Sequence, residues 1–563
     1  MRYLQIKTAI TIFFAAAFIV GSYNVEAQLP QKEEITVIAP YEPTVPEVLK
    51  INIQPKIEIG ESKLPALEIN PEPVKMNILH NIEPIQEAAP PPDSIKTIYR
   101  NHIRAGFGNY ITPYLELNSG TLRNQNYLLN LHFRHISSLG KIKNYGHSAF
   151  SDNMLQINGK KFFERFTLGS KIKYDREVVH HYGFLKAEFP DSVYNTSKDQ
   201  LRQRFNQTGF AITAQSNNKN LQGFQYDGSL SFDFINDLYE TKGNQIEFKS
   251  QLNSFFRLFR TNDRQNLGMN IGIGNYNTTD SVKTSKNTLI QLQPYMKFKY
   301  QEYEVKVGLG LAFDNDSSMH FSIYPLAEGR LQLVKDRVDV FVGIDGEKQA
   351  NTFQNLVQQN PFLQSVLDYR NSSTKLRFYG GLQSSIGKHL DFTIAGYNTI
   401  IDNMPLFIND TIAPYNRFIV VYDDLNIVQG KASVSVSLSQ QLRISTGFVI
   451  SSYTTDNQIK AWHLPAFKTY FEGWYNYSEK LAFRGSVYSH GKSWTNVWNS
   501  NLNRQEETEI KPWVNLSIGA TYRLNRQLHF FIDARNIITG RHFYWYNYPS
   551  QRLNVMAGAG FSF

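Results

Sequence analysis

The chain has 563 residues, a net charge of +9, no cysteine and 14% aromatic residues. The absence of cysteine excludes disulfides, thiolate metal sites, cysteine nucleophiles and a lipid anchor on cysteine. Beyond the N-terminal segment there is no run of 18 apolar residues, which excludes a bundle of membrane helices. The many aromatic residues, together with abundant Asn, Ser and Gln, favour a large all-β protein.

Residues 1–27 have the features of an export signal. Arg2 and Lys7 form a basic start, and residues 8–20 form an apolar core of suitable length. A small residue, Ala27, precedes the expected cleavage point, so we expect a mature chain that starts at Gln28. The alternative is an uncleaved N-terminal anchor. In either case the pattern indicates an exported bacterial protein.

Residues 28–96 form a proline-rich segment that contains 12 of the 22 prolines. Such a density excludes long helices and central strands, because proline has no amide donor. Short alternating runs between the prolines are typical of an extended segment that pairs with a periplasmic protein by strand addition. A net charge of −4 over residues 28–100 favours a basic partner surface. A solvated linker without a partner is the alternative.

From residue 97 to residue 563 apolar and polar residues alternate with period 2 in segment after segment. In residues 305–313 (VKVGLGLAF) every second residue is apolar, and residues 129–134 and 290–300 repeat the pattern. An apolar face turned to lipid and a polar face turned to a lumen are typical of a transmembrane barrel wall. We therefore predict an all-β, antiparallel, up-and-down transmembrane barrel of about 18–22 strands.

The connections between these segments alternate in length, which separates a membrane barrel from a soluble β-sandwich. Short periplasmic turns are predicted at 123–126, 217–220, 301–303, 334–337, 387–390, 439–442, 478–480 and 523–527. Long outer loops are predicted at 184–200, 276–287, 346–373, 400–416 and 490–511. Because an exported N-terminus starts in the periplasm, the first strand runs outward.

The chain ends on an alternating segment, residues 553–563, that closes with Phe561 and Phe563. This is the pattern that the outer-membrane barrel assembly machinery reads. We therefore expect that machinery as a partner during biogenesis and outer-membrane lipid as the permanent surroundings. The expected location is the cell outer membrane, with the barrel as an integral component.

Several short stretches resemble a group of Bacteroidota outer-membrane barrels that are labelled TonB-dependent-receptor-like. These stretches are residues 135–143, 150–153, 174–176, 181–184, 461–465 and 544–549. The resemblance covers essentially the whole mature chain and implies a transport or receptor function. The chain differs from true TonB-dependent receptors because only the proline-rich residues 28–96 stand where those receptors carry a folded plug domain.

A second feature points toward the same family. Glu34, Ile35, Thr36, Val37 and Ile38 are similar to a TonB box, an extended strand that pairs with an energy-transducing periplasmic protein. A plain extended segment is the alternative for this composition.

The sequence contains no catalytic constellation, so we expect no enzyme activity and no cofactor. Residues 314–316 begin like a calcium loop, but Met319 stands where that loop needs glycine, and an outer-loop turn is the favoured interpretation. His180 and His181 are adjacent and on a strand would face opposite ways, which excludes a shared metal. We expect neither a metal nor a nucleic-acid partner.

Five basic residues fall on the polar faces of their strands and are therefore predicted to line the lumen: Arg134, Lys171, Lys173, Lys297 and Lys306. They could form an anion-preferring conduit, because a low-dielectric wall focuses their potential. The favoured alternative is that they pair with Glu116, Asp227, Asp233 and Glu304 on the same surface. The basic excess could also meet phosphates of the outer leaflet.

A barrel of this size encloses a wide lumen, and such barrels are normally plugged. The best internal candidate is the loop 346–373, in which residues 349–367 have an amphipathic pattern for a short helix that Pro361 ends or kinks. An outer loop without order is the alternative.

Two functions remain open at this stage. The first is a transport or receptor-type barrel for an unidentified solute. The second is an envelope scaffold, or a component of an assembly or secretion complex, that docks through residues 28–96.

Overall fold

The computed structural model describes residues 98–563, except for 123, 189–196, 218–222, 258–264, 317, 336, 388, 413–414 and 500–501. The proposed signal, the proline-rich segment and the TonB-box-like residues 34–38 lie outside the described residues. Among the described residues, no helix is long and apolar enough to cross a membrane.

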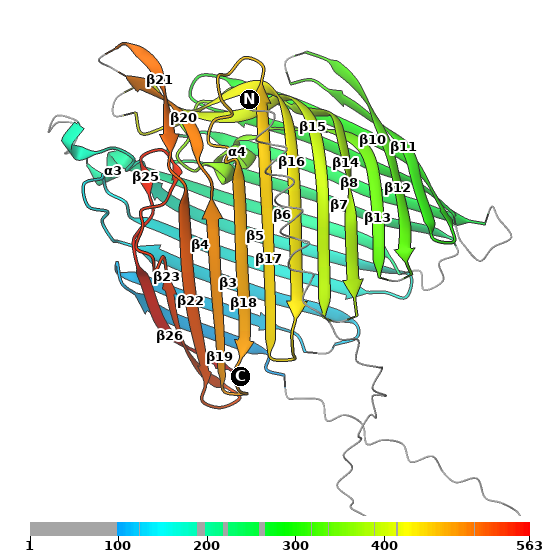
Figure 1. Ribbon diagram of the computed structural model, residues 1–563, viewed down its shortest axis with the longest axis horizontal. Coiled ribbons are helices and arrows are strands. Elements are labelled where there is room, and N and C mark those ends of the chain that lie inside the picture. The colour runs from blue at the N-terminus through cyan, green and yellow to red at the C-terminus, as the bar shows by residue number, and fades with distance from the viewer. Residues whose placement is uncertain are drawn as a thin grey trace, which may run out of the picture. The chain divides into compact units, whose positions relative to one another are not determined.

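The described chain forms one closed antiparallel sheet of 22 strands (Figure 1). Its first eleven strands are β1 (Asn101–Gly108), β2 (Thr112–Gly120), β3 (Tyr127–Ser138), β4 (Phe150–Phe162), β5 (Phe166–His180), β6 (Arg202–Ser216), β7 (Phe224–Asn236), β8 (Lys242–Phe256), β9 (Gln265–Thr279), β10 (Thr284–Tyr300) and β11 (Tyr303–Asp314). The other eleven are β12 (His320–Val334), β13 (Val338–Gln349), β14 (Ser372–Ile386), β15 (Leu390–Asn409), β16 (Phe418–Ser437), β17 (Leu442–Thr455), β18 (Phe467–Asn476), β19 (Leu481–His490), β22 (Trp513–Arg523), β23 (Leu528–Arg535) and β26 (Asn554–Ser562).

The sheet closes where the first strand pairs with the last. Residues of β1 lie opposite residues of β26, with Ala105 opposite Ala559. Backbone hydrogen bonds of 2.8 and 2.9 Å between Asn101 and Phe563 complete the seam. Each strand otherwise pairs with its neighbours in sequence, so the prediction of an up-and-down barrel is confirmed at the upper end of the expected strand number.

The two faces of each wall strand differ as the alternation predicts, and β5 shows this clearly. Its outward residues Leu168 and Ile172 are 41% and 47% exposed, although they are apolar. The alternate residues include Lys171 and Lys173, and end at Val179, which is buried against a loop inside the barrel. The outward face is therefore apolar and the inward face is polar, as a lipid-facing wall requires.

The two ends of the barrel differ in the length of their connections. At one end the connections include 163–165, 301–302 and 387–389, and we call this the short-turn end. The opposite end, the long-loop end, carries the loops 181–201, 350–371, 456–466, 491–512 and 536–553. Two of its loops contain small hairpins, β20 (Ser493–Asn499) with β21 (Arg504–Ile510), and β24 (Phe543–Trp545) with β25 (Tyr548–Pro549).

Two predicted outer loops are much shorter than expected. Strands β9 and β10 pair up to Thr279 and Thr284, so the expected loop 276–287 is reduced to residues 280–283. Likewise β15 continues to Asn409, where it pairs with Phe418 of β16. The connection is therefore residues 410–417, in place of the expected loop 400–416. Polar residues there remain in strands because the backbone ladder continues beyond the apolar band of the wall.

Candidate functional site at the long-loop end

The loop 350–371 folds inside the barrel at its long-loop end and contains the helix α4 (Phe353–Gln359). Thr352 caps the helix, because its side chain accepts a hydrogen bond of 3.2 Å from the amide of Asn355. The helix ends before Pro361, as the sequence predicts. A short ordered helix therefore replaces the alternative of an outer loop without order.

An apolar cluster holds this loop against the inner wall, and we call it the mouth core. It consists of Val179, Phe205, Ile235, Phe353, Leu356, Val357, Leu363, Leu367, Phe407, Phe418 and Tyr548. These residues come from β5–β7 on one side, from β15 and β16 on another, from the α4 loop between them (Figure 1), and, for Tyr548, from β25. Leu356 and Phe418 are fully buried, so the loop is packed closely against the inner wall of the long-loop end.

Polar contacts fix the same loop. The carboxylate of Asp237 accepts a hydrogen bond of 3.0 Å from the side-chain amide (Nε2) of Gln203 and another from the hydroxyl of Ser365. Burial raises the pKa of Asp237, and these hydrogen bonds oppose that shift. At the other side of the loop, the amide of Gln364 donates to the carbonyl of Phe418 at 2.9 Å. The loop is thus attached to two opposite parts of the wall.

The β24–β25 hairpin adds an aromatic contact. The rings of Phe362 and Tyr548 are stacked with centroids 3.6 Å apart, and Tyr182 meets the ring of Tyr548 edge-on at 4.9 Å. Tyr182 also donates a hydrogen bond of 3.0 Å to the carbonyl of Pro549. Gly183 allows this approach, since a Cβ there would lie 2.3 Å from the Tyr548 ring. Burial raises the pKa of Tyr548 well above its usual value.

Two cavities flank the closed mouth. The first is about 470 Å³ and lies between Phe362 and the inner wall, where Glu177, Asn515 and Arg535 contribute polar groups. The second is about 570 Å³ and is dominated by aromatic rings, with Phe407, Trp462, Trp513, Tyr544 and Trp545 among its lining residues. A cavity lined by aromatic rings with a few polar groups is typical of a small-molecule site.

Burial keeps two histidines at this end neutral: His463, which lines the aromatic cavity, and His181, which precedes Tyr182. Burial lowers the pKa of His463 to about 4, although its Nδ1–H donates to the carbonyl of Phe407 at 2.9 Å. Burial also lowers the pKa of His181 to about 3, with Arg417 and His180 acting in the same direction. Each ring is thus a neutral polar group at ordinary pH.

The five basic residues predicted for the lumen lie on the inward faces of their strands. Arg134 makes a 2.7 Å ion pair with Asp152, and Lys173 pairs with Asp175. Lys171 lies on the same face of β5, two residues before Lys173.

The two remaining cations lie on β10 and β11. Lys297 pairs with Glu304 at 2.7 Å, and the Lys306 amine lies 4.3 Å from the ring centre of Tyr295. Of the expected acidic partners, Glu304 forms this ion pair, and Asp233 interacts electrostatically with Lys171 and Lys173. Three of the five cations are therefore neutralised on the wall, which argues for pairing over an anion-preferring conduit.

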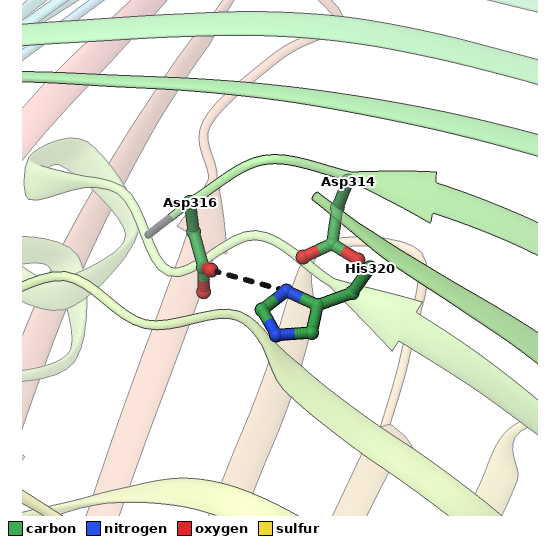
Figure 2. A group of neighbouring side chains, drawn as sticks. All are labelled: Asp314, Asp316 and His320. Atoms are coloured by element: carbon green, nitrogen blue, oxygen red, sulfur yellow. Dashed lines mark ion pairs between the residues drawn. The ribbon is translucent and has the colours of Figure 1, made fainter. Parts of the chain in front are cut away.

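Asp314, Asp316 and His320 come together at the turn between β11 and β12 (Figure 2). His320 Nδ1 lies 4.0 Å from a carboxylate oxygen of Asp316, and Asp314 is paired with Lys348. The charge of Asp314 is thus neutralised by Lys348, which lies near the end of β13, directly before the loop 350–371 (the plug loop). The cluster serves as an attachment of that loop, in agreement with the outer-loop turn expected from the sequence.

Phe561 and Phe563 lie at the end of β26 with stacked rings 5.7 Å apart. Both are exposed, at 43% and 48%, and Phe561 faces outward opposite Ile103. Tyr182 and Tyr548 lie within stretches that carry the family resemblance (181–184 and 544–549), but no local pattern shows that they meet Phe418 at the mouth. The aromatic density of residues 543–548 was the available signal for them.

Comparison with known proteins relates the chain by its fold. No family model matches the sequence, and no curated protein matches it. Among solved structures, the siderophore receptor PirA from Acinetobacter baumannii superposes with a TM-score of 0.63 at 10% identity, covering 83% of this chain and 81% of that one. The pyoverdine outer-membrane receptor FpvA from Pseudomonas aeruginosa gives 0.62 at 11% identity, covering 83% and 78%. The chain therefore shares the barrel fold of these receptors.

Proposed function

We propose that the chain is an integral outer-membrane barrel of the transport or receptor type. The closed 22-stranded wall with an apolar outer face supports a membrane location, and the fold is that of siderophore receptors. The observation that carries the proposal is the loop 350–371 packed inside the mouth: with α4 it bridges β5–β7 and β15–β16, and two cavities lie beside it. The long-loop end then faces the outside.

In this proposal the aromatic cavity receives the solute and the 350–371 loop acts as the gate. Tyr544, which is 56% exposed, offers its ring to a ring-bearing solute, and Lys468 provides a polar contact. Passage requires release of the loop from the mouth core. The hydrogen bonds at Asp237 and Phe418 are the contacts that such a release breaks.

The periplasmic side of the proposal rests on the sequence. Residues 34–38 pair with a TonB-like protein by strand addition, and Phe561 and Phe563 direct assembly. The competing function is an envelope scaffold that docks through residues 28–96. The proline-rich composition of residues 28–96 supports it, because short alternating runs between prolines are suited to strand addition.

Deletion of residues 33–39 separates these functions. We compare three strains of the encoding bacterium, with the intact gene, the short deletion and the whole gene removed, on a panel of nutrient sources. The transport proposal predicts that both deletions abolish growth on the same nutrient. Normal growth of the short-deletion strain would exclude the TonB version. Detergent sensitivity of the whole-gene deletion without a nutrient defect would support the scaffold.

A further inference from the structure

The outward face of β5 and β6 changes from apolar to basic near the long-loop end. On β5 the outward residue Tyr174 is 39% exposed, and Arg176 is the next residue on the same face, because side chains alternate along a strand. On β6 Phe210 faces outward with 39% exposure, and Arg204 and Arg202 lie on that face nearer to the loops. Three arginines therefore follow directly on the lipid-facing part of these two strands.

The register of the two strands makes these arginines neighbours. Arg176 lies opposite Asn206, and Arg204 stands two residues beyond Asn206 on the same face. Such diagonal neighbours in an antiparallel pair are about 7–8 Å apart at the backbone, within the reach of two long side chains. Arg202 follows Arg204 on the same face at a distance of about 7 Å along the strand. The three guanidinium groups can therefore meet one anion.

These arginines have no carboxylate partner. Among the described residues none of the three forms an ion pair, whereas the inward-facing Arg134 and Arg484 each do. The Nε of Arg204 is buried and has no hydrogen-bond partner there. Asp199, in the short helix α3 (Lys198–Leu201) before β6, is in no ion pair either. Unpaired cations beside a hydrocarbon layer are costly, so an anion from outside the chain is expected to meet them.

The outward cations of this part of the wall lie mainly at one end. In the described strands β3–β10 the outward positions hold no Asp or Glu. Outward cations near the short-turn end are limited in these strands to Lys161. Those near the long-loop end are Arg176, Arg202, Arg204, Lys242 and Lys286. The positive charge thus lies at the margin that faces the outer leaflet when the long loops face outside.

The chemistry of the cluster selects a phosphate. A phosphate monoester carries nearly two negative charges and three acceptor oxygens, and guanidinium groups bind such oxygens in pairs. The outer leaflet of an outer membrane consists of lipid A, a glycolipid whose phosphates lie at the level where head groups meet acyl chains. Arg176 and Arg204 lie at this level, because Tyr174 and Phe210 belong to the apolar band.

We propose that Arg176, Arg204 and Arg202 bind a phosphate of lipid A on the outer surface of β5 and β6. The acyl chains of the bound lipid lie along Tyr174 and Phe210, below the arginines. The phosphate supplies the negative charge that no described carboxylate provides, and it offers an acceptor at the Nε of Arg204. The inference rests on the membrane location and orientation proposed above.

Binding of lipid A to the purified full chain in detergent tests the site, with native mass spectrometry to count bound lipids. The site variant combines Arg176→Gln with Arg204→Gln. The matched control combines Lys161→Gln with Arg165→Gln, which removes the same charge from exposed positions at the short-turn end. Lipid A stripped of its phosphates and phosphatidylglycerol are the comparison lipids, and slower migration after heating verifies that each variant is folded.

We expect the site variant to bind lipid A about tenfold more weakly than the parent, because it loses two charged hydrogen-bond donors. The control variant should bind as the parent does. Equal binding by the site variant and the parent would overturn the site. Equal binding of dephosphorylated lipid A by the parent would overturn recognition of the phosphate. Phosphatidylglycerol bound as tightly as lipid A, with the same loss in the site variant, would overturn the assignment to lipid A.

A charge-preserving variant separates loss of charge from damage to the wall. Arg176→Lys with Arg204→Lys keeps both cations and should retain most of the binding. A folded lysine variant that binds as weakly as the glutamine variant would overturn an electrostatic site. The membrane location is judged separately: a parent protein that stays in solution without detergent would remove it, whereas a detergent-dependent parent that binds no lipid A would overturn only the lipid site.

Discussion

At the residue scale, the closed mouth depends on a few side chains placed where chain segments approach very closely. Tyr548 is in contact with Tyr182 and Phe362, and its hydroxyl donates to the carbonyl of Asn416. His181 lies beside this contact, 1% exposed, with its Nδ1 lacking a hydrogen-bond partner among the described residues. Such positions tolerate neither extra volume nor extra charge.

Acid should loosen the mouth through His181. Its pKa is about 3 in the folded chain against about 6.5 when exposed. The contribution of neutral His181 to the stability of the mouth is therefore fully present above pH 6.5 and is lost as the pH falls toward 3. Asp410 acts oppositely, since burial raises its pKa to about 6 and Arg417 only partly offsets this. We expect faster amide hydrogen exchange in residues 350–371 at pH 4.5 than at pH 7, after correction for intrinsic rates. His181→Leu should reduce this rise in exchange at pH 4.5. An unchanged rise in the variant would show that a group other than His181 is responsible.

Added volume at Gly183 should also open the mouth. Gly183→Ala places a methyl group against the Tyr548 ring, and overpacking of this kind costs about 1–3 kcal/mol. Gly396→Ala is the matched control, because a Cβ at Gly396 meets no atom within 4 Å. Limited proteolysis within residues 350–371 should accelerate in the first variant only. Equal protection of both would show that the hairpin adapts without cost.

At the element scale, the short helix α4 acts as the stopper of a wide lumen. Leu356 and Val357 lie one turn after the Thr352 cap and are buried among the residues of the mouth core. A helix this short is unstable alone, so its order comes from the packing.

A charge in the buried face of α4 should release the loop. Leu356→Asp introduces an unpaired carboxylate at a site with no exposure, whereas Gln358→Asp alters the same helix at a position that contacts Gln207 at the surface. In planar bilayers we expect high conductance for Leu356→Asp and low conductance for Gln358→Asp and the parent. Low conductance in all three would mean that another segment closes the lumen.

At the scale of the whole molecule, closure of β1 on β26 removes the two edges that an open sheet would expose. The closed wall also brings β5–β7 into contact, through the plug loop, with β15 and β16. This closure should make the folded barrel resistant to detergent.

The purified protein should migrate faster in unheated than in heated detergent gels. Phe563→Ala should lower the amount of this fast-migrating form in membranes, because it removes the terminal aromatic residue of the assembly signal. Phe530→Ala removes a similarly exposed aromatic residue, 46% exposed on β23, and should assemble normally. Recovery of the parent protein in the soluble periplasm would contradict the membrane location, and equal yields of both variants would contradict the signal.

The sequence by itself determined the wall, because period-2 alternation is a local property of each strand. For the loop 346–373 it left a short helix ending near Pro361 and a loop without order as alternatives, and packing decided for the helix. Strand ends were less accurate, as at 276–287 and 400–416, because backbone pairing continues where the alternation becomes polar.

Only the tertiary structure decided what the barrel does with these elements. The mouth core joins residues from Val179 to Tyr548, and no local pattern shows which distant segments a closed sheet will bring together. The position of Arg176 beside Arg204 on the outward face depends in the same way on the register between β5 and β6. Alternation specifies the face of each side chain, whereas register and closure depend on the pairing of the whole sheet.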